Sequence, residues 1–327
     1  MSASAPSPPP SAIVTRLRAA GCVFAEDEAR LLISAASTPA DLAAMVDRRA
    51  AGLPLEHVVG WAEFCGLRIA VDPGVFVPRR RSEFLVRQAA GLAGWQSGRP
   101  GQAPGPASPA AAALTGQVSA PGRQALAGHL GRVGRPAVIV DLCCGSGALG
   151  AALAASLDRA ELHAADIDPA AVRCARRNLA ARGGRVYEGD LYQPLPPALR
   201  GRVDILLANV PYVPTDAVRT LPPEARLHEA RQALDGGLDG LDVLRRVASA
   251  APLWLAPGGH LLAETSERQA RPAAEAYERG GLAARVVRSA DLNATVVIGT
   301  RPARAAAGAG LPGRRVPRPR PAGRPGQ

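Results

Sequence analysis

The sequence predicts an α/β protein with a doubly wound, mostly parallel sheet, joined to a small N-terminal helical domain by a β-hairpin connector. Three observations predict it. From residue 137 onward, short apolar runs alternate with helical segments, which is typical of a parallel sheet with helices on both faces. The first run ends in a glycine-rich turn, and such sheets bind ligands at the carboxyl ends of their strands. Between residues 13 and 51, in contrast, apolar residues recur at helical spacing.

The N-terminal part of the chain begins with a Ser, Pro and Ala leader, residues 1–11, which has no periodicity and which we expect to be disordered. In the helical domain, 12–52, Thr38 precedes a proline, an order typical of a helix cap followed by the first helical residue. The connector, 53–95, is expected to hold a β-hairpin around residues 63–77 and a helix over 82–93.

The main domain, 137–301, contains the alternating elements. Expected strands cover residues 137–140, 161–165, 185–188, 203–208, 260–264, 284–288 and 295–300. Expected helices follow the glycine-rich turn and cover 169–181, 238–253 and 266–278. The last two strands are expected to be antiparallel.

The positive charge of the chain lies in two segments. The 327 residues include 39 basic and 28 acidic side chains, a formal net charge of +11. The insert, 96–136, and the tail, 302–327, contain Arg but no acidic residue, and both are dense in Pro, Gly and Ala. We therefore expect low-complexity or disordered segments, of which the tail would contact nucleic acid nonspecifically at most. Charge alone does not indicate a nucleic-acid-binding protein.

Several classes of protein are disfavoured by the sequence. No run approaches the roughly 18 apolar residues of a membrane span, and the first residues lack the basic-then-apolar order of a signal peptide. The five cysteines, of which none belongs to a C-x-x-C pair or has a His at ligand spacing, are expected to be reduced thiols rather than zinc ligands. We expect a cytoplasmic monomer without a metal.

The glycine-rich turn carries the first functional signal. Asp141-Leu142-Cys143-Cys144-Gly145-Ser146-Gly147 follows a strand and opens a helix. With Gly150 it also spells the dinucleotide fingerprint G-x-G-x-x-G. In that fingerprint the glycines directly follow the strand, whereas here an acid follows it and would repel a pyrophosphate. Asp141 suits the cationic amino and sulfonium groups of S-adenosylmethionine, and Asp166 ends the next strand, where a ribose diol would lie. We therefore favour S-adenosylmethionine over NAD.

The two cysteines of this turn, Cys143 and Cys144, are interpreted as small side chains in a crowded turn. A nucleophilic thiol is the alternative, since a helix N-terminus lowers the pKa of a thiol.

The second signal is Asn209-Val210-Pro211-Tyr212, directly after the strand 203–208. It resembles the Asn-Pro-Pro-Tyr signature of methyltransferases that modify planar amino or amide nitrogens. An amide nitrogen is a poor nucleophile because its lone pair is delocalised. Two acceptors on its N–H groups, the Asn209 side-chain oxygen and the Val210 carbonyl, would favour pyramidalisation and direct the lone pair at the methyl group. Tyr212 would pack on the flat face of the acceptor.

With both loops in place, the chain resembles the protein-(glutamine-N5) methyltransferases that modify peptide chain release factors. Further segments carry the resemblance. They are His57-Val58-Val59-Gly60 with Glu63 to Leu67, Val77-Pro78-Arg79-Arg80-Arg81-Ser82-Glu83 (similar to Pro-Arg-Pro-x-Thr-Glu), Glu224 to Glu229, Ala233 to Leu241, and Pro257-Gly258-Gly259 to Glu264 with Gln269.

The resemblance implies a Rossmann-like, S-adenosylmethionine-dependent methyltransferase fold. It implies that the helical domain helps to recognise the release factor and that the acceptor is the glutamine of a Gly-Gly-Gln motif. By position, the cofactor would be held by Asp141, Cys143, Gly145, Ser146, Gly147, Asp166, Asp190, Leu191 and Asn209, and the glutamine by Asn209, Val210, Pro211 and Tyr212. Leu191 stands where the family has a Trp near the adenine, and Arg79 and Glu83 would lie near the cofactor entrance or pair on the surface.

Three alternatives to this function remain at the level of the sequence. An N6-adenine-type nucleic-acid methyltransferase needs nearly the same acceptor loop, although neither a basic cleft nor a target-recognition domain is visible for flipping a base. A divergent paralogue could modify another protein glutamine, because Val210 replaces a proline, the helical domain is short and the insert precedes the first strand of the main domain. A noncatalytic adaptor that retains the fold is the third alternative. The intact Asp141, Gly145, Gly147, Asn209 and Tyr212 argue against it.

Overall fold

The computed structural model of the protein describes residues 8–96 and 135–303. The predicted leader, insert and tail lie for the most part outside these residues. Within the described part, no helix is long and apolar enough to cross a membrane.

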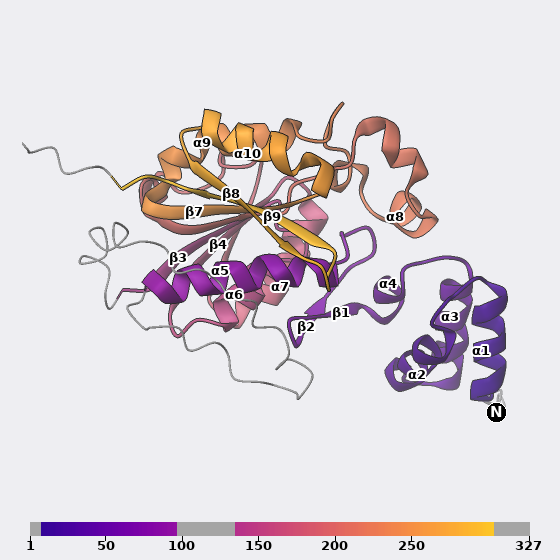
Figure 1. Ribbon diagram of the computed structural model, residues 1–327. Helices are drawn as coiled ribbons and strands as arrows, with labels where there is room; N and C mark the ends of the chain where they lie inside the picture. The colour runs from indigo at the N-terminus through magenta and orange to yellow at the C-terminus, as the bar shows by residue number, and fades with distance from the viewer. Residues whose placement is uncertain (1–7, 97–134, 304–327) are drawn as a thin grey trace, which may run out of the picture.

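Four helices form the N-terminal part: α1 (Pro10–Ala19), α2 (Ala25–Ala35), α3 (Pro39–Ala50) and α4 (Leu55–Val59). They gather at one end of the molecule, away from the sheet (Figure 1). Their apolar faces meet in a core of their own, which includes Ile13, Leu32 and Met45 and extends to Val58. As predicted, Thr38 caps α3: its hydroxyl oxygen accepts a hydrogen bond from the Asp41 N–H at 3.1 Å.

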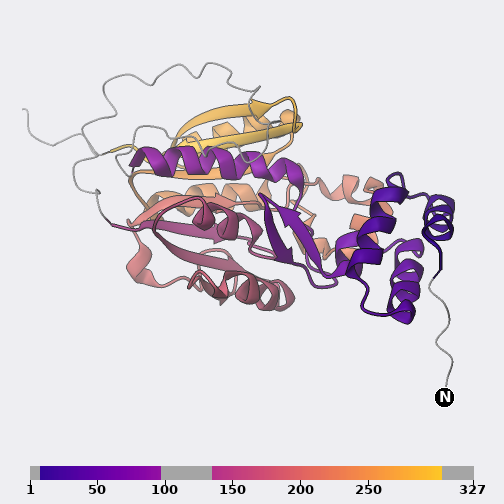
Figure 2. The ribbon, with the colours of Figure 1, turned by 90° about the horizontal axis from the view of Figure 1, so that it is seen from below.

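The connector contains the predicted hairpin, β1 (Trp61–Phe64) paired antiparallel with β2 (Leu67–Ala70). A single 3-10 turn, η1 (Arg80–Ser82), then leads into α5 (Glu83–Gln96). Helix α5 lies along the sheet of the main domain (Figure 2), because its apolar residues Leu85 and Ala89 pack into the same core cluster as Leu149 of the main domain.

The main domain is a seven-stranded sheet in the order β5-β4-β3-β6-β7-β9-β8. Its strands are β3 (Ala137–Leu142), β4 (Ala160–Asp166), β5 (Arg185–Glu188), β6 (Val203–Ala208), β7 (Leu255–Thr265), β8 (Ala283–Ser289) and β9 (Ala294–Thr300). Strands β3 to β7 are parallel, whereas β9 is antiparallel to both of its neighbours, β7 and β8. Of the last two strands, therefore, only β9 runs against the rest of the sheet, and it is inserted between β7 and β8.

Helices cover both faces of this sheet (Figure 1). On one face α5, α6 (Ala148–Ala155) and α7 (Pro169–Ala180) share a core cluster, and on the other α9 (Asp242–Trp254) and α10 (Ala270–Arg279) share a second one. The short elements are η3 (Pro197–Leu199), η4 (Thr215–Thr220), α8 (Pro223–His228), η5 (Arg231–Ala233) and η6 (Glu267–Gln269). This is the predicted α/β architecture, with alternating strands and helices.

Two predicted helix starts were wrong. The helix expected over 266–278 is the 3-10 turn η6 followed by α10, which begins at Ala270. The helix expected over 238–253 begins at Asp242. The preceding residues form a tight loop in which Gly237 and Gly240 have φ of +92° and +77°, and a right-handed helix cannot include such residues.

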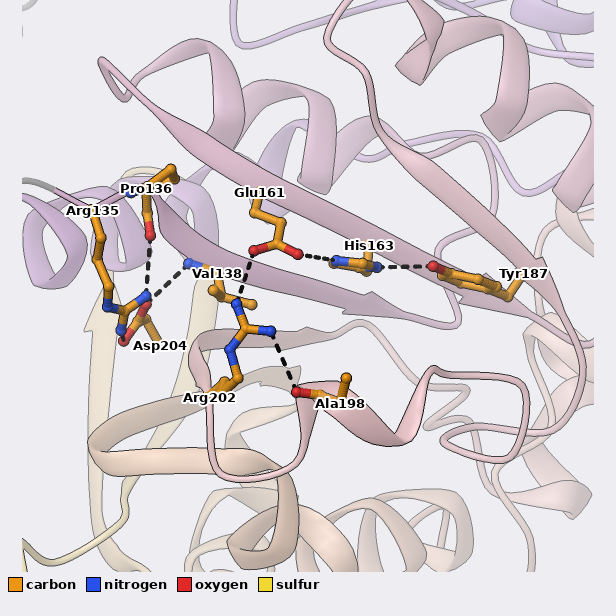
Figure 3. Close-up of polar contacts among 9 residues, drawn as sticks. All are labelled: Arg135, Pro136, Val138, Glu161, His163, Tyr187, Ala198, Arg202 and Asp204. Carbon is orange, nitrogen blue, oxygen red and sulfur yellow. Dashed lines mark hydrogen bonds and ion pairs between the residues drawn. The ribbon is translucent and has the colours of Figure 1, made fainter.

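Polar side chains fix the amino ends of the central strands, at the edge opposite the carboxyl ends (Figure 3). The carboxylate of Asp204 accepts from the Arg135 guanidinium at 2.7 Å and from the Val138 N–H at 2.9 Å. Beside it, Glu161 contacts both His163 and Arg202. These contacts anchor the start of β3 where the described chain resumes at residue 135. They lie at the opposite edge of the sheet from the carboxyl ends of the parallel strands.

Candidate active site

A cavity of about 730 Å³ lies at the carboxyl ends of the parallel strands. The turn after β3, the residues after β4 and β5, and the loop after β6 supply one side of it. Residues from the connector and from the segment 221–235 supply the other side, and Pro54 and Glu56 extend the wall to α4. The two sequence signals, which are far apart along the chain, thus meet at one cavity, as expected for a doubly wound sheet.

The turn after β3 is built on residues with left-handed backbone conformation. Cys143, Gly145 and Gly147 have φ of +53°, +53° and +78°. A Cβ atom at Gly147 would lie 3.2 Å from both Ala175 and Leu179 of α7. Gly147 therefore allows α6 and α7 to pack closely, and it does not itself line the cavity.

Asp141 supports this turn from below. Its side chain is fully buried, and its Oδ2 accepts from the Gly150 N–H at 2.9 Å, which fastens the first turn of α6 to β3. Its Oδ1 is buried without a hydrogen-bond partner among the described residues, and burial raises the pKa of this carboxyl to about 8. Like Gly147, Asp141 does not line the cavity.

The other predicted cofactor residues do line the cavity: Cys143, Gly145, Ser146, Asp166, Asp190, Leu191 and Asn209. Asp166 accepts from the Gly145 N–H at 2.8 Å, so the acid after β4 also shapes the glycine turn. Asp190 forms an ion pair with Arg246 of α9, and Arg246 is a wall residue that the sequence did not indicate. Leu191 is buried and presents an aliphatic wall at this end.

The cysteines of the turn have the properties of inert thiols. Burial, together with the nearby carboxylates, raises the pKa of Cys143 and of Cys144. Because the thiolate is the nucleophilic form, the structure favours the interpretation as small side chains in a crowded turn.

The acceptor loop begins where β6 ends, and Asn209, Val210, Pro211 and Tyr212 all line the cavity. The Asn209 Oδ1 is buried and has no hydrogen-bond partner within residues 8–96 and 135–303. A buried amide oxygen without a donor is costly, and nearly all such atoms have a partner. Asn209 is therefore a candidate for binding a ligand that carries an N–H donor.

A second glycine-rich segment holds the acceptor loop in place. The Val213 N–H donates to the Leu234 carbonyl at 3.0 Å, and the Gly236 N–H donates back to the Val213 carbonyl at 2.8 Å. A Cβ atom at Gly236 would lie 2.5 Å from the Pro211 carbonyl oxygen. This segment resembles a family segment in sequence, and the resemblance implies no role for it. Its role is close backbone packing against the loop.

Residues 79–83 include some that line the cavity and others, such as Glu83, that do not. Arg79 lines the cavity and pairs at 2.6 Å with Glu229, a buried carboxylate of the opposite wall. Glu83 instead accepts from the Cys65 N–H at 3.1 Å and does not line the cavity. Arg81 and Ser82 also line the cavity, and no sequence pattern indicated this because their partner, Glu264, is distant in the sequence.

Comparison with known proteins gives consistent matches. The family model "Methyltransferase small domain" matches residues 117–240. The chain is 34% identical over 248 residues to a release factor glutamine methyltransferase of Geobacter sulfurreducens, covering 74% of this chain and 72% of the relative. It is 34% identical over 259 residues to that of Mycolicibacterium smegmatis, covering 78% of each. It is also 33% identical over 224 residues to a 4-amino-L-phenylalanine/4-methylamino-L-phenylalanine methyltransferase of Streptomyces pristinaespiralis, covering 68% of this chain and 65% of the relative.

Proposed function

Since this chain belongs to the release factor glutamine methyltransferase family, we propose that it transfers a methyl group from S-adenosylmethionine to a protein glutamine. The acceptor is the side-chain amide nitrogen of the Gly-Gly-Gln glutamine of peptide chain release factors. The observation that carries the acceptor chemistry is Asn209, a residue of the cavity lining whose Oδ1 is buried without a hydrogen-bond partner among the described residues. An amide NH₂ group supplies the donor that this oxygen lacks.

The described residues fit S-adenosylmethionine. The Oδ1 of Asp141, which lacks a partner among the described residues, is a buried acceptor beneath the glycine turn. Asp141 lies beside Leu207 of β6, the strand that leads into the loop 209–212. In its ionised form, the Asp141 carboxyl would favour a ligand that carries positive charge on the cavity side of the turn. Gly145, Ser146, Asp166, Asp190 and Leu191 would hold the cofactor. When bound, the cofactor supplies an activated methyl group on a sulfonium.

The residues of the chain contribute mainly by positioning. Asn209 would accept one N–H of the glutamine amide and the Val210 carbonyl the other, so that the nitrogen lone pair points at the methyl group. The same two acceptors would stabilise the positive charge that develops on nitrogen. Tyr212 supports the flat face of the amide. The raised pKa of Cys143 agrees with direct transfer that uses no protein nucleophile.

We further propose that the N-terminal helices help to recognise the release factor. Arg49 of α3 is buried and pairs with Glu28 and with Glu224 of α8, both at 2.6 Å. Helix α8 lies in the segment that borders the cavity, so this contact joins the helical domain to the cavity rim. The domain boundaries, the cytoplasmic location and the monomeric state stay predictions.

The test is mass spectrometry of a release factor after incubation with the protein and S-adenosylmethionine. One added methyl group on the Gly-Gly-Gln glutamine is the expected result, and a Gly-Gly-Glu substrate variant is the matched negative control. The relative that acts on 4-aminophenylalanine makes a free aromatic amine the second acceptor to assay. Methylation of that amine, with none on the release factor, would contradict the proposed acceptor.

A further inference from the structure

We infer that Glu264 is a positioning residue for the reaction: its buried carboxylate fixes the side chain of Tyr212 at the acceptor end of the cavity. The inference rests on the proposed function for its kinetic consequence. It goes beyond that function by assigning a role to a residue at the end of β7.

Three donors from two distant parts of the chain converge on Glu264. The carboxylate is 3% exposed. It accepts from Arg81 Nε at 2.7 Å, from Ser82 Oγ at 2.5 Å and from the Tyr212 hydroxyl at 3.2 Å. A buried carboxylate is stable only when such partners are present. Glu264 therefore ties the turn before α5 to the acceptor loop through the end of β7.

The hydrogen bonds fix the orientation of the phenol. Arg81 also contacts the Tyr212 hydroxyl oxygen. A guanidinium can only donate and a carboxylate can only accept. The single hydroxyl proton of Tyr212 must therefore point to Glu264, while the oxygen accepts from Arg81. Burial, together with the Glu264 charge, raises the pKa of Tyr212, so the phenol keeps this proton.

The backbone of Tyr212 is held independently. The Gln269 Nε2 donates to the Tyr212 carbonyl at 2.8 Å and to the Asp239 carbonyl at 2.9 Å. Because the main chain is already fixed, loss of the Glu264 carboxylate would release the ring and leave the loop in place. A misplaced ring would misalign the acceptor amide, and small misplacements lower rates strongly.

The experiment is a double-mutant cycle of Glu264→Gln and Tyr212→Phe, assayed by release factor methylation and by affinity for S-adenosylhomocysteine. We expect each single variant to lower kcat by about tenfold or more, with cofactor affinity unchanged within about twofold. In the Tyr212→Phe background, Glu264→Gln should change kcat by less than about threefold, because coupled residues are not additive. The control is Glu267→Gln, an exposed residue three positions away, which should match the wild type.

Two outcomes would overturn the inference: independent, multiplicative effects on kcat, or a loss of cofactor affinity equal to the loss of rate. The unfolding equilibrium of the same four proteins, measured in urea, gives a readout that needs no acceptor. Coupling of the two residues in stability is expected, and additive destabilisation would contradict the contact. If the wild type does not methylate the release factor, the proposed function fails, and the urea cycle still decides whether Glu264 holds Tyr212.

Discussion

Binding of S-adenosylmethionine should release a proton from Asp141. Burial raises the pKa of this carboxyl to about 8 in the free protein, so about 0.9 of the molecules carry its proton at pH 7. Asp141 lies behind the glycine turn rather than in the cavity wall, and a positively charged ligand in the cavity would favour the ionised form of its carboxyl and lower the pKa. If the bound form is fully ionised, about 0.9 proton leaves per cofactor bound at pH 7 and about 0.5 at pH 8.

Isothermal titration calorimetry in buffers of different ionisation enthalpy measures this release directly. The slope of the observed enthalpy against buffer enthalpy gives the proton count. S-adenosylhomocysteine, which lacks the sulfonium charge, should release fewer protons than S-adenosylmethionine, and Asp141→Asn should release none. A slope of zero at pH 7 for the wild type, or an unchanged slope in Asp141→Asn, would refute the reasoning.

The same carboxyl should make stability pH-dependent in the free protein. The pKa in the folded state lies above the unfolded value of 3.8, so between these values the folded chain binds more protons than the unfolded chain. Its contribution to stability is therefore fully present below about pH 4 and is lost as the pH rises toward 8. The free energy of unfolding in urea should differ most between the wild type and Asp141→Asn near pH 8, and this difference should shrink toward pH 4.

Three further predictions follow from the site and its supports. Asn209→Ala should lower kcat by about 10²-fold or more, with cofactor affinity within about twofold by calorimetry; unchanged kcat would remove Asn209 from the acceptor site. Gly240→Ala should abolish activity and destabilise by about 1–3 kcal/mol in urea, because its Cβ would overlap an acceptor-loop carbonyl. The control Gly281→Ala has a similar φ of +83° and open space around it, so it should keep activity. Arg49→Met should cost about 3–5 kcal/mol in urea, since it leaves a buried carboxylate unpaired; a loss below about 1 kcal/mol would contradict the burial argument.

The sequence was a good guide to whatever depends on local pattern. The strand limits 185–188 and 203–208 agree with β5 and β6, because apolar runs bounded by polar or turn residues mark buried strands directly. The two loops that follow β3 and β6 meet at one cavity because parallel strands end at the same edge. The predicted start of α9 was wrong, because packing against the acceptor loop shapes the glycine loop that precedes this helix.

The parts that could not be predicted depend on long-range contact. Asp141 was expected to face the cofactor, but the structure directs one of its oxygens at Gly150, on the helix that follows. A sequence shows that an acid ends a strand, and it does not show on which side of the turn the carboxyl lies. In the same way, Arg81 and Glu264 lie 183 positions apart, so no spacing rule could pair them.

The replacement of proline by Val210 in the acceptor loop is explained by the same long-range contacts. Proline would restrict this position through its ring, whereas Val210 is restricted by burial, at 2% exposure within the main core, and by the proline that follows it. The loop is also fixed downstream, where Val213 exchanges two backbone hydrogen bonds with the segment 234–236. Rigidity supplied by tertiary packing can replace rigidity supplied by a ring. The carbonyl of residue 210 is retained in either case, so the substitution keeps the backbone acceptor that we propose for the glutamine amide.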